Sequence, residues 1–135
     1  MWLFTDFGFF SVVEKPGDRG DGRLTVRGRI RADMESFRAR HLPSASELVE
    51  LDRADYRYRF RAPKAEVARA MAAIAAGIDY DDFKATVEEK HGWMRHDIYE
   101  TVWATLHTLC HLDQPSADDR QPSAALSGDD PGPVR

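Results

Sequence analysis

The sequence predicts a small α+β domain in which an antiparallel sheet of about four strands is covered on one face by helices. The first half of the chain alternates apolar and polar side chains with period two and is interrupted by turn residues, which is typical of strands. The following segment carries apolar side chains at helical spacing. Strands joined as hairpins lie antiparallel, so the expected order is ββαββααα.

The first predicted hairpin joins residues 9–13 to residues 24–31 across a loop rich in glycine. The first arm is rich in aromatic and β-branched residues, and in the second arm Leu24, Val26 and Ile30 alternate with polar residues. Residues 2–5 form either an added short strand or the beginning of the same strand before a bulge at Gly8.

The second predicted hairpin joins residues 47–51 to residues 56–61. Its first arm is ambiguous, because residues 44–50 could also begin a helix. Between the two hairpins, Asp33 is expected to cap a helix that runs to about His41 and stops before Pro43.

Three helices are predicted after the second hairpin. The first follows Pro63, ends near Gly77 and carries one apolar stripe, made of Val67, Met71, Ile74 and Ile78. The second is short and is capped by an acidic cluster, Asp79, Asp81 and Asp82, for which capping is a simpler explanation than Mg²⁺ binding or acid–base catalysis. The longest helix is expected from about Arg95 to Leu112.

The chain of 135 residues is long enough for one hydrophobic core, and its 42% apolar and 31% charged residues are typical of globular proteins. We therefore expect a single domain over residues 1–112. Residues 113–135 are rich in Pro, Ser and Asp and contain Leu126 and Val134 as their large apolar residues, so a disordered acidic tail is expected.

The net charge of −4 is unevenly distributed along the chain. Residues 1–64 hold 13 Lys and Arg against 10 Asp and Glu, whereas residues 65–112 hold 4 against 8. The overall acidity argues against general affinity for nucleic acids. It leaves room for a local basic surface in the first half of the chain. The single cysteine, Cys110, and the lack of a signal peptide or a long apolar run indicate a cytoplasmic protein without membrane association.

The N-terminal string MWLFT, followed by GFFSVV at residues 8–13, resembles the opening of a family of small uncharacterised bacterial proteins, chiefly actinobacterial. Residues 26–31, residues 55–56 with the strand after them, and residues 78–84 are also similar to that family. The resemblance covers about residues 1–110. It implies a standalone intracellular protein and brings no assigned activity, cofactor or catalytic residue.

Two predicted strands carry an arginine at every second position: Arg27, Arg29 and Arg31 in the first, and Arg57, Arg59 and Arg61 in the second. Since side chains alternate across a strand, all six are expected on the face opposite the apolar residues. Guanidinium groups bind phosphate and carboxylate and stack on bases, so this face could bind an anion or single-stranded nucleic acid. A solvated face paired with Glu47 or Glu50 explains the same pattern without a ligand.

Large aromatic residues are concentrated at the N-terminus, where Trp2, Phe4, Phe7 and Phe9 are the candidate interface residues. Core packing is the simpler explanation, but so many rings exceed what one short strand can easily bury. Some of them are therefore expected to form a contact with a second copy or another protein.

Three possible metal ligands, His107, Cys110 and His111, share helical spacing near the end of the last predicted helix. A buried cysteine and histidines at a helix C-terminus explain them without a metal, so no metal and no cofactor are expected.

Recognisable nucleotide-binding, nucleophile-elbow and zinc-ribbon motifs are lacking. We therefore expect a non-catalytic interaction or regulatory protein that associates through its N-terminal aromatic strand or its sheet surface. The alternatives are anion or single-stranded nucleic-acid binding on the arginine face, and a small-molecule enzyme without a recognisable motif.

Overall fold

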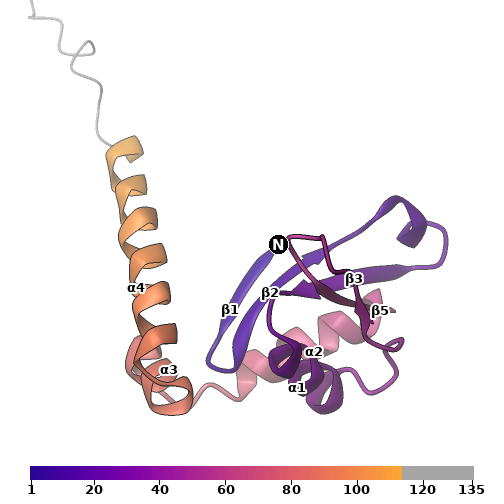
Figure 1. Ribbon diagram of the computed structural model, residues 1–135, viewed down its shortest axis with the longest axis horizontal. Helices are drawn as coiled ribbons and strands as arrows, with labels where there is room; N and C mark the ends of the chain where they lie inside the picture. The colour runs from indigo at the N-terminus through magenta and orange to yellow at the C-terminus, as the bar shows by residue number, and fades with distance from the viewer. Residues whose placement is uncertain (114–135) are drawn as a thin grey trace, which may run out of the picture. The chain divides into compact units, whose positions relative to one another are not determined.

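The computed structural model, which describes residues 1–113, contains a five-stranded sheet with the order β1-β2-β3-β5-β4 (Figure 1). The strands are β1 (Trp2–Thr5), β2 (Gly8–Val13), β3 (Arg23–Gly28), β4 (Val49–Glu50) and β5 (Tyr58–Pro63). Every neighbouring pair is antiparallel, which confirms the predicted α+β class. The sheet has one strand more than expected, because β1 is a separate strand that turns into β2 at Asp6 and Phe7.

The helices are α1 (Arg31–His41), α2 (Lys64–Ala76), α3 (Phe83–His91) and α4 (Trp93–His107), with short 3₁₀ segments η1 (Pro16–Asp18) and η2 (Thr108–Asp113). The chain divides into two compact units, Met1–Glu100 and Thr101–Arg135. Beyond Asp113, the predicted tail lies outside the described residues. Within residues 1–113 we find no helix with the length and apolar character needed to span a bilayer.

Helices α1 and α2 pack on one face of the sheet and form the core with it (Figure 1). Their buried side chains meet apolar residues that alternate along β2, β3 and β5. The core contains Phe10, Val12, Val26, Phe60 and Ala62 from the sheet and Met34, Phe37, Val67 and Ala70 from the helices. The opposite face of the sheet therefore carries the alternate set of side chains, including Arg27, Arg59 and Ser11.

The ends of several elements are set by local chemistry that the sequence indicated correctly. Asp82 caps α3 by accepting a hydrogen bond from the Ala85 N–H at 3.0 Å. Gly77 follows the last residue of α2, as expected. Gly92 has φ 82°, which favours glycine, and lets the chain turn from α3 into α4.

One predicted helix start is wrong. The N-cap of α1 is Ile30, and Asp33 lies in the first turn, where its carboxylate binds Arg95 of α4 instead of capping the helix. The helix expected after Pro63 does begin at Lys64, and Pro63 is both the last residue of β5 and the N-cap of α2. In the α2 stripe, Val67 is buried and Ile74 is half-buried, whereas Ile78 lies beyond the helix and is exposed.

The first arginine-bearing strand is shorter than predicted. Strand β3 ends at Gly28, so Arg29 follows the strand and Arg31 begins α1. Ile30, which was expected on the apolar face, is 46% exposed. The chain leaves the sheet here because α1 begins at once and its Met34 packs against Gly28, where a Cβ would lie 2.7 Å from the Met34 sulfur.

The second arginine-bearing strand also begins later than predicted, at Tyr58 rather than Tyr56. Tyr56 was expected on the apolar face with Phe60 but packs beside Phe9 and Arg27 on the opposite face. Because Tyr56 and Arg57 precede the regular strand, strict alternation of side chains does not apply to them.

Candidate functional site

Four of the six predicted arginines are neutralised by carboxylates. The ion pairs are Arg29 with Asp55, Arg31 with Glu35 and Glu50, Arg57 with Glu50 and Asp52, and Arg61 with Asp18 and Asp21. Hydrogen bonds from Arg31 and Arg57 hold the pKa of Glu50 below its ordinary value. The prediction that Glu50 pairs with these arginines is therefore confirmed, whereas none of the ion pairs within residues 1–113 involves Glu47.

The remaining two arginines, Arg27 and Arg59, lie directly opposite each other on β3 and β5. Arg27 donates from Nη2 to Ser11 Oγ at 2.8 Å, and Arg59 donates from Nη2 to the Tyr56 carbonyl at 3.0 Å. Neither makes an ion pair with a carboxylate of the described residues. The structure thus separates the six arginines into four paired groups and two adjacent unpaired ones.

Tyr56 organises the sheet face around these arginines. Its ring lies between two guanidinium groups, with its centroid 4.5 Å from Arg27 Cζ and 4.4 Å from Arg29 Cζ. The Phe9 ring lies 6.4 Å from the same centroid. Cation–π contacts of this kind hold guanidinium groups in place without neutralising their charge.

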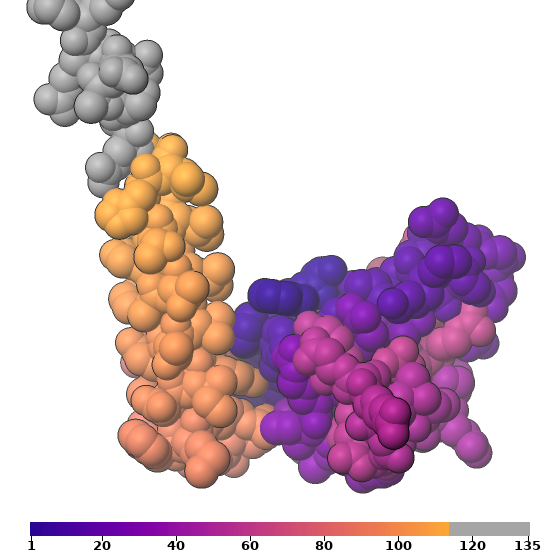
Figure 2. Space-filling view, turned by 45° about the horizontal axis from the view of Figure 1, so that its top comes forward, coloured from indigo at the N-terminus to yellow at the C-terminus, as the bar shows by residue number. Residues whose placement is uncertain are grey.

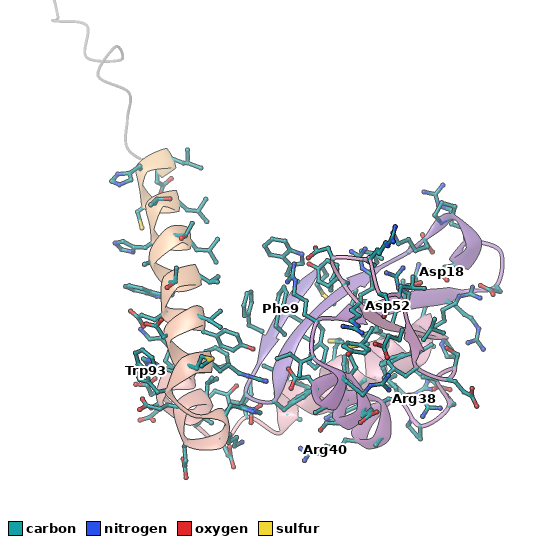
Figure 3. The ribbon with its side chains drawn as sticks, in the orientation of Figure 1. Phe9, Asp18, Arg38, Arg40, Asp52 and Trp93 are labelled. Atoms are coloured by element: carbon teal, nitrogen blue, oxygen red, sulfur yellow. The ribbon has the colours of Figure 1, made fainter. Side chains whose placement is uncertain are left out.

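The loop between β2 and β3 is anchored by Asp18, which is labelled in Figure 3. Its carboxylate accepts hydrogen bonds from Thr25 Oγ1 at 2.7 Å, from the Lys15 N–H at 2.8 Å and from Arg61 Nε at 2.6 Å. This loop extends beyond the rest of the sheet in Figures 1 and 2. Asp18 therefore has a structural explanation, although the sequence offered no signal for it because its partners are distributed along the chain.

The aromatic residues near the N-terminus contribute mainly to packing. Phe7 contacts Phe10 and Phe37 of the core, and Phe4 packs on Phe9 and on Tyr99 of α4. Trp2 differs from the other three candidate interface residues, because it is 67% exposed and meets Phe9 edge to face. Of the predicted aromatic interface, Trp2 is thus the member that offers a large free surface.

A buried ion pair joins the first turns of α4 to α1. Arg95 binds Asp33 with three hydrogen bonds of 2.9 to 3.1 Å, and both side chains are mostly shielded from solvent. Burial raises the pKa of Asp33 above its ordinary value, and the Arg95 charge opposes this shift. Sequence analysis missed this pair, because 62 residues separate its members.

The Asp33–Arg95 pair lines a hollow of about 450 Å³ that also includes Lys90, His91 and Asp6. Lys90 pairs with the Asp6 carboxylate, and His91 Nε2 lies 2.9 Å from the Asp6 carbonyl oxygen. The charged groups of Asp6, Asp33, Lys90 and Arg95 are thus paired with one another. Such complementary pairing is typical of a structural junction, and Arg40, which also lines the hollow, makes no ion pair within residues 1–113.

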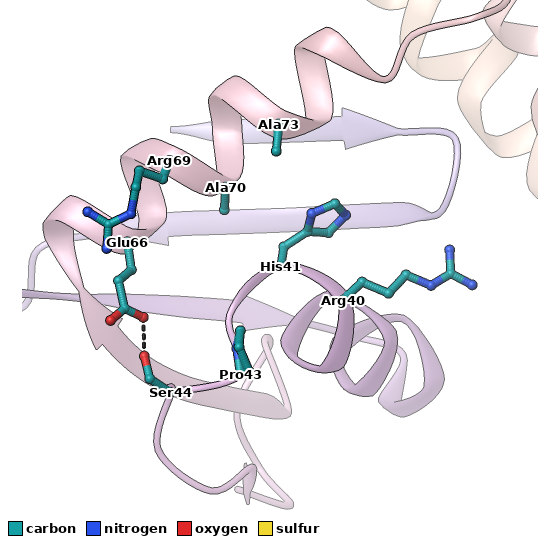
Figure 4. Close-up of a pocket in the computed structure, with 8 residues that line it drawn as sticks. All are labelled: Arg40, His41, Pro43, Ser44, Glu66, Arg69, Ala70 and Ala73. Carbon is teal, nitrogen blue, oxygen red and sulfur yellow. Dashed lines mark hydrogen bonds between the residues drawn. The ribbon is translucent and has the colours of Figure 1, made fainter.

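A second hollow, of about 380 Å³, lies between the end of α1 and α2 (Figure 4). Arg40, His41 and Arg69 line it, and Ser44 donates a hydrogen bond to Glu66 at its rim. Figure 4 shows the two guanidinium groups on opposite sides of the hollow. Burial and the nearby Arg40 charge lower the pKa of His41, which favours its neutral form.

Helix α4 carries an apolar face that the described residues leave exposed. Its first residue, Trp93 (labelled in Figure 3), is 66% exposed, and Ile98 and Leu106 of α4 and Leu109 of η2 are each more than half exposed. These exposed fractions are properties of the structure that the sequence alone does not give.

The three candidate metal ligands of the sequence lie at the end of α4 and in η2. Cys110 Sγ lies 3.9 Å from His107 Nδ1, and His107, Cys110 and His111 are all exposed. Within residues 1–113 we find no group of three donors placed to hold a metal ion. The ring of His107 instead stacks on Trp103 at a centroid distance of 5.3 Å.

Comparisons of the chain with protein-family models, with curated proteins and with solved structures found no match, so the family resemblance stays a prediction and any function must be argued from the geometry of the chain itself.

Proposed function

We propose that this chain is a non-catalytic interaction protein that forms a dimer through the apolar face of its C-terminal helix, α4. The observation that carries the proposal is the distribution of exposed apolar side chains. Of the thirteen large apolar residues exposed within residues 1–113, seven lie between positions 93 and 112: Trp93, Met94, Ile98, Trp103, Leu106, Leu109 and Leu112.

Several of the apolar side chains in this segment share one side of α4, whereas Trp103 stacks on His107 on the other side. Ile98, Val102 and Leu106 of α4 follow each other at intervals of four residues, which places them along one side of the helix, and Leu109 follows in η2. Polar residues such as Glu100 and His107 occupy the other side. An exposed apolar helix face of this length favours docking against another apolar helix.

A second copy of the chain is the occupant that fits this face best. The segment after Asp113 has Leu126 and Val134 as its large apolar residues, so its composition cannot supply a matching apolar stripe. Two α4 helices can pair antiparallel through this side, with Val102 beside Leu106 of the partner subunit. In this arrangement each copy covers the apolar face of the other.

The expected dimer is of moderate stability. A stable interface buries about 800 Å² on each partner and involves roughly 20 to 30 residues a side. One helix face supplies fewer residues than this. Dimerisation should therefore depend on protein concentration in the micromolar range.

Sedimentation velocity of the full chain over a range of concentrations tests the proposal. We expect a monomer–dimer equilibrium that Leu106→Glu shifts to monomer, because a carboxylate on the apolar face cannot be paired there. Ala104→Glu introduces the same side chain on the polar side of the same helix and should leave the dimer unchanged. A monomeric wild-type chain at all concentrations would contradict the proposal.

A further variant distinguishes this surface from the aromatic strand. Trp2→Ala should leave dimerisation unchanged, because Trp2 belongs to β1 and not to α4. If Trp2→Ala dissociates the dimer and Leu106→Glu does not, association through the N-terminal strand replaces the α4 interface. A reducing cytoplasm is the compartment proposed for this protein, since its free Cys110 is exposed on the same segment.

A further inference from the structure

One row of side chains crosses all five strands on the sheet face opposite α1 and α2. The strand register aligns Trp2 with Ser11, Ser11 with Arg27, Arg27 with Arg59, and Arg59 with Val49. The row therefore has an exposed indole at one end, an exposed valine at the other and two guanidinium groups in between.

The two central arginines form an arrangement that is unfavourable without an anion. Like charges directly opposite each other on neighbouring strands repel. The described residues place no carboxylate within ion-pair distance of Arg27 or Arg59, in contrast to Arg29, Arg57 and Arg61 on the same region of the sheet. The Nε atoms of both groups are also buried without a hydrogen-bond acceptor, which adds a desolvation cost.

Neutral contacts hold both guanidinium groups in place and leave donors free. Arg27 is fixed by Ser11 Oγ and the Tyr56 ring, and Arg59 by the Tyr56 carbonyl. Each of these hydrogen bonds uses one Nη2 donor, so the Nη1 groups donate to no protein atom and are not buried. Two guanidinium groups that are already held in position and have free N–H donors can bind several oxygens of one phosphoryl group.

We propose that Arg27 and Arg59 together bind the phosphoryl group of a small phosphorylated ligand. Strands are spaced about 4.8 Å apart, so Trp2 lies roughly 10 Å from Arg27 along the row. This separation suits a ligand that carries a phosphate and an aromatic ring, such as a mononucleotide, with the ring stacked on the exposed indole. The site is independent of α4, so it can exist whether or not the chain forms a dimer.

The binding test uses three probes with the full chain at low salt: inorganic phosphate, adenosine 5′-monophosphate and adenosine. We expect both phosphate-bearing probes to bind by calorimetry and adenosine not to bind. Arg27→Lys and Arg59→Lys each keep the charge but lose the planar fork, and should weaken binding about tenfold or more. Arg57→Lys is the matched control, since Glu50 and Asp52 already occupy that guanidinium, and should change affinity less than about twofold.

A second measurement does not depend on the variants remaining folded. The buried Nε–H groups of Arg27 and Arg59 should give slowly exchanging signals in ¹⁵N–¹H spectra of the wild-type protein. Phosphate should shift these two signals and leave that of Arg57 in place. Tighter binding of the nucleotide than of phosphate, reduced by Trp2→Ala, would identify a mononucleotide as the source; equal affinities would indicate free phosphate.

The proposal is overturned if neither inorganic phosphate nor adenosine 5′-monophosphate binds at millimolar concentration and the Nε–H signals of Arg27 and Arg59 do not move. Unchanged affinity in both Arg27→Lys and Arg59→Lys would also overturn it, because diffuse attraction to positive charge survives a substitution that keeps the charge, whereas a site built from planar guanidinium groups does not. Binding to an oligonucleotide but to neither small probe would replace it by a polyanion surface, whose affinity falls steeply with salt.

Discussion

Arg61 of β5 donates a hydrogen bond from Nε to the Asp18 carboxylate at 2.6 Å, across 43 residues of sequence. The Asp18 side chain is 1% exposed, whereas that of Arg61 is 41% exposed. A partly exposed arginine thus closes the β2–β3 loop onto the sheet by neutralising a buried carboxylate.

We predict that the stability contributed by Asp18 is lost at low pH. Burial acts to raise its pKa, but hydrogen bonds from Thr25, the Lys15 N–H and Arg61 outweigh burial and lower the pKa below its ordinary value. Folding therefore favours the ionised form. The stabilisation is fully present above the ordinary Asp pKa of about 3.9 and disappears as pH falls through the lower folded-state value.

A ¹³C titration of the Asp18 carboxyl carbon, combined with urea unfolding at the same pH values, checks this. The folded-state midpoint should lie below that of a model peptide. A midpoint above the peptide value would show that burial dominates and that the hydrogen bonds do not hold in solution.

We predict that Gly8→Ala destabilises the protein by about 1–3 kcal/mol, the usual range for overpacking a core. A Cβ at position 8 would lie 2.7 Å from Phe10 Cζ and 2.8 Å from Asp33 Oδ2. Neither neighbour can easily move, since Phe10 is fully buried and Arg95 holds Asp33. Gly20→Ala meets no atom within 4 Å and should change the unfolding free energy by less than about 0.5 kcal/mol.

We predict that Arg95→Met destabilises the protein on the order of 2 kcal/mol, because it leaves the Asp33 carboxylate buried without its partner. Burial already raises the pKa of Asp33, and removing Arg95 should raise it further. The loss should be largest at neutral pH and should shrink as pH falls and Asp33 takes up a proton.

Unfolding of the double variant Asp33→Asn with Arg95→Met provides the control. An amide needs no counter-charge, so the double variant should be more stable at pH 7 than Arg95→Met alone. Equal stabilities would mean that the arginine stabilises the junction through packing of its aliphatic stem rather than through charge.

We predict that Phe37→Ala costs about 3–5 kcal/mol, whereas Ile74→Ala costs about 1–2 kcal/mol. Phe37 is fully buried and its ring lies 4.6 Å from that of Phe10 and 6.3 Å from that of Phe60. Ile74 packs against the same core but is only partly buried. Denaturant unfolding of both variants checks the order, and a larger loss for Ile74→Ala would contradict the placement of α2.

The fold class could be predicted because it depends on local periodicity. The aromatic and β-branched run at residues 9–13 and the spacing of Val67, Met71 and Ile74 are properties of neighbouring residues, and β2 and α2 include these residues. Asp82 caps its helix for the same reason, since its hydrogen-bond partner is three residues away.

The side-chain pairing could not be predicted, because it depends on residues distant in sequence. Asp33 has the composition of an N-cap, yet a partner 62 residues away determines its role. Asp55 lies next to Tyr56 in a turn but pairs with Arg29 of the other hairpin. The six arginines look equivalent in the sequence, and only the register and the ion pairs separate Arg27 and Arg59 from the rest.

The lengths of the two outer strands affect how the protein behaves in a crowded solution. A sheet can grow by adding strands from other molecules wherever an edge strand presents a long row of unpaired backbone groups. Here β1 presents four residues and β4 presents two, and Glu50 places a charge on the shorter edge. The sheet therefore offers only short edges to which strands of other molecules could add. This favours a protein that stays dispersed at high concentration.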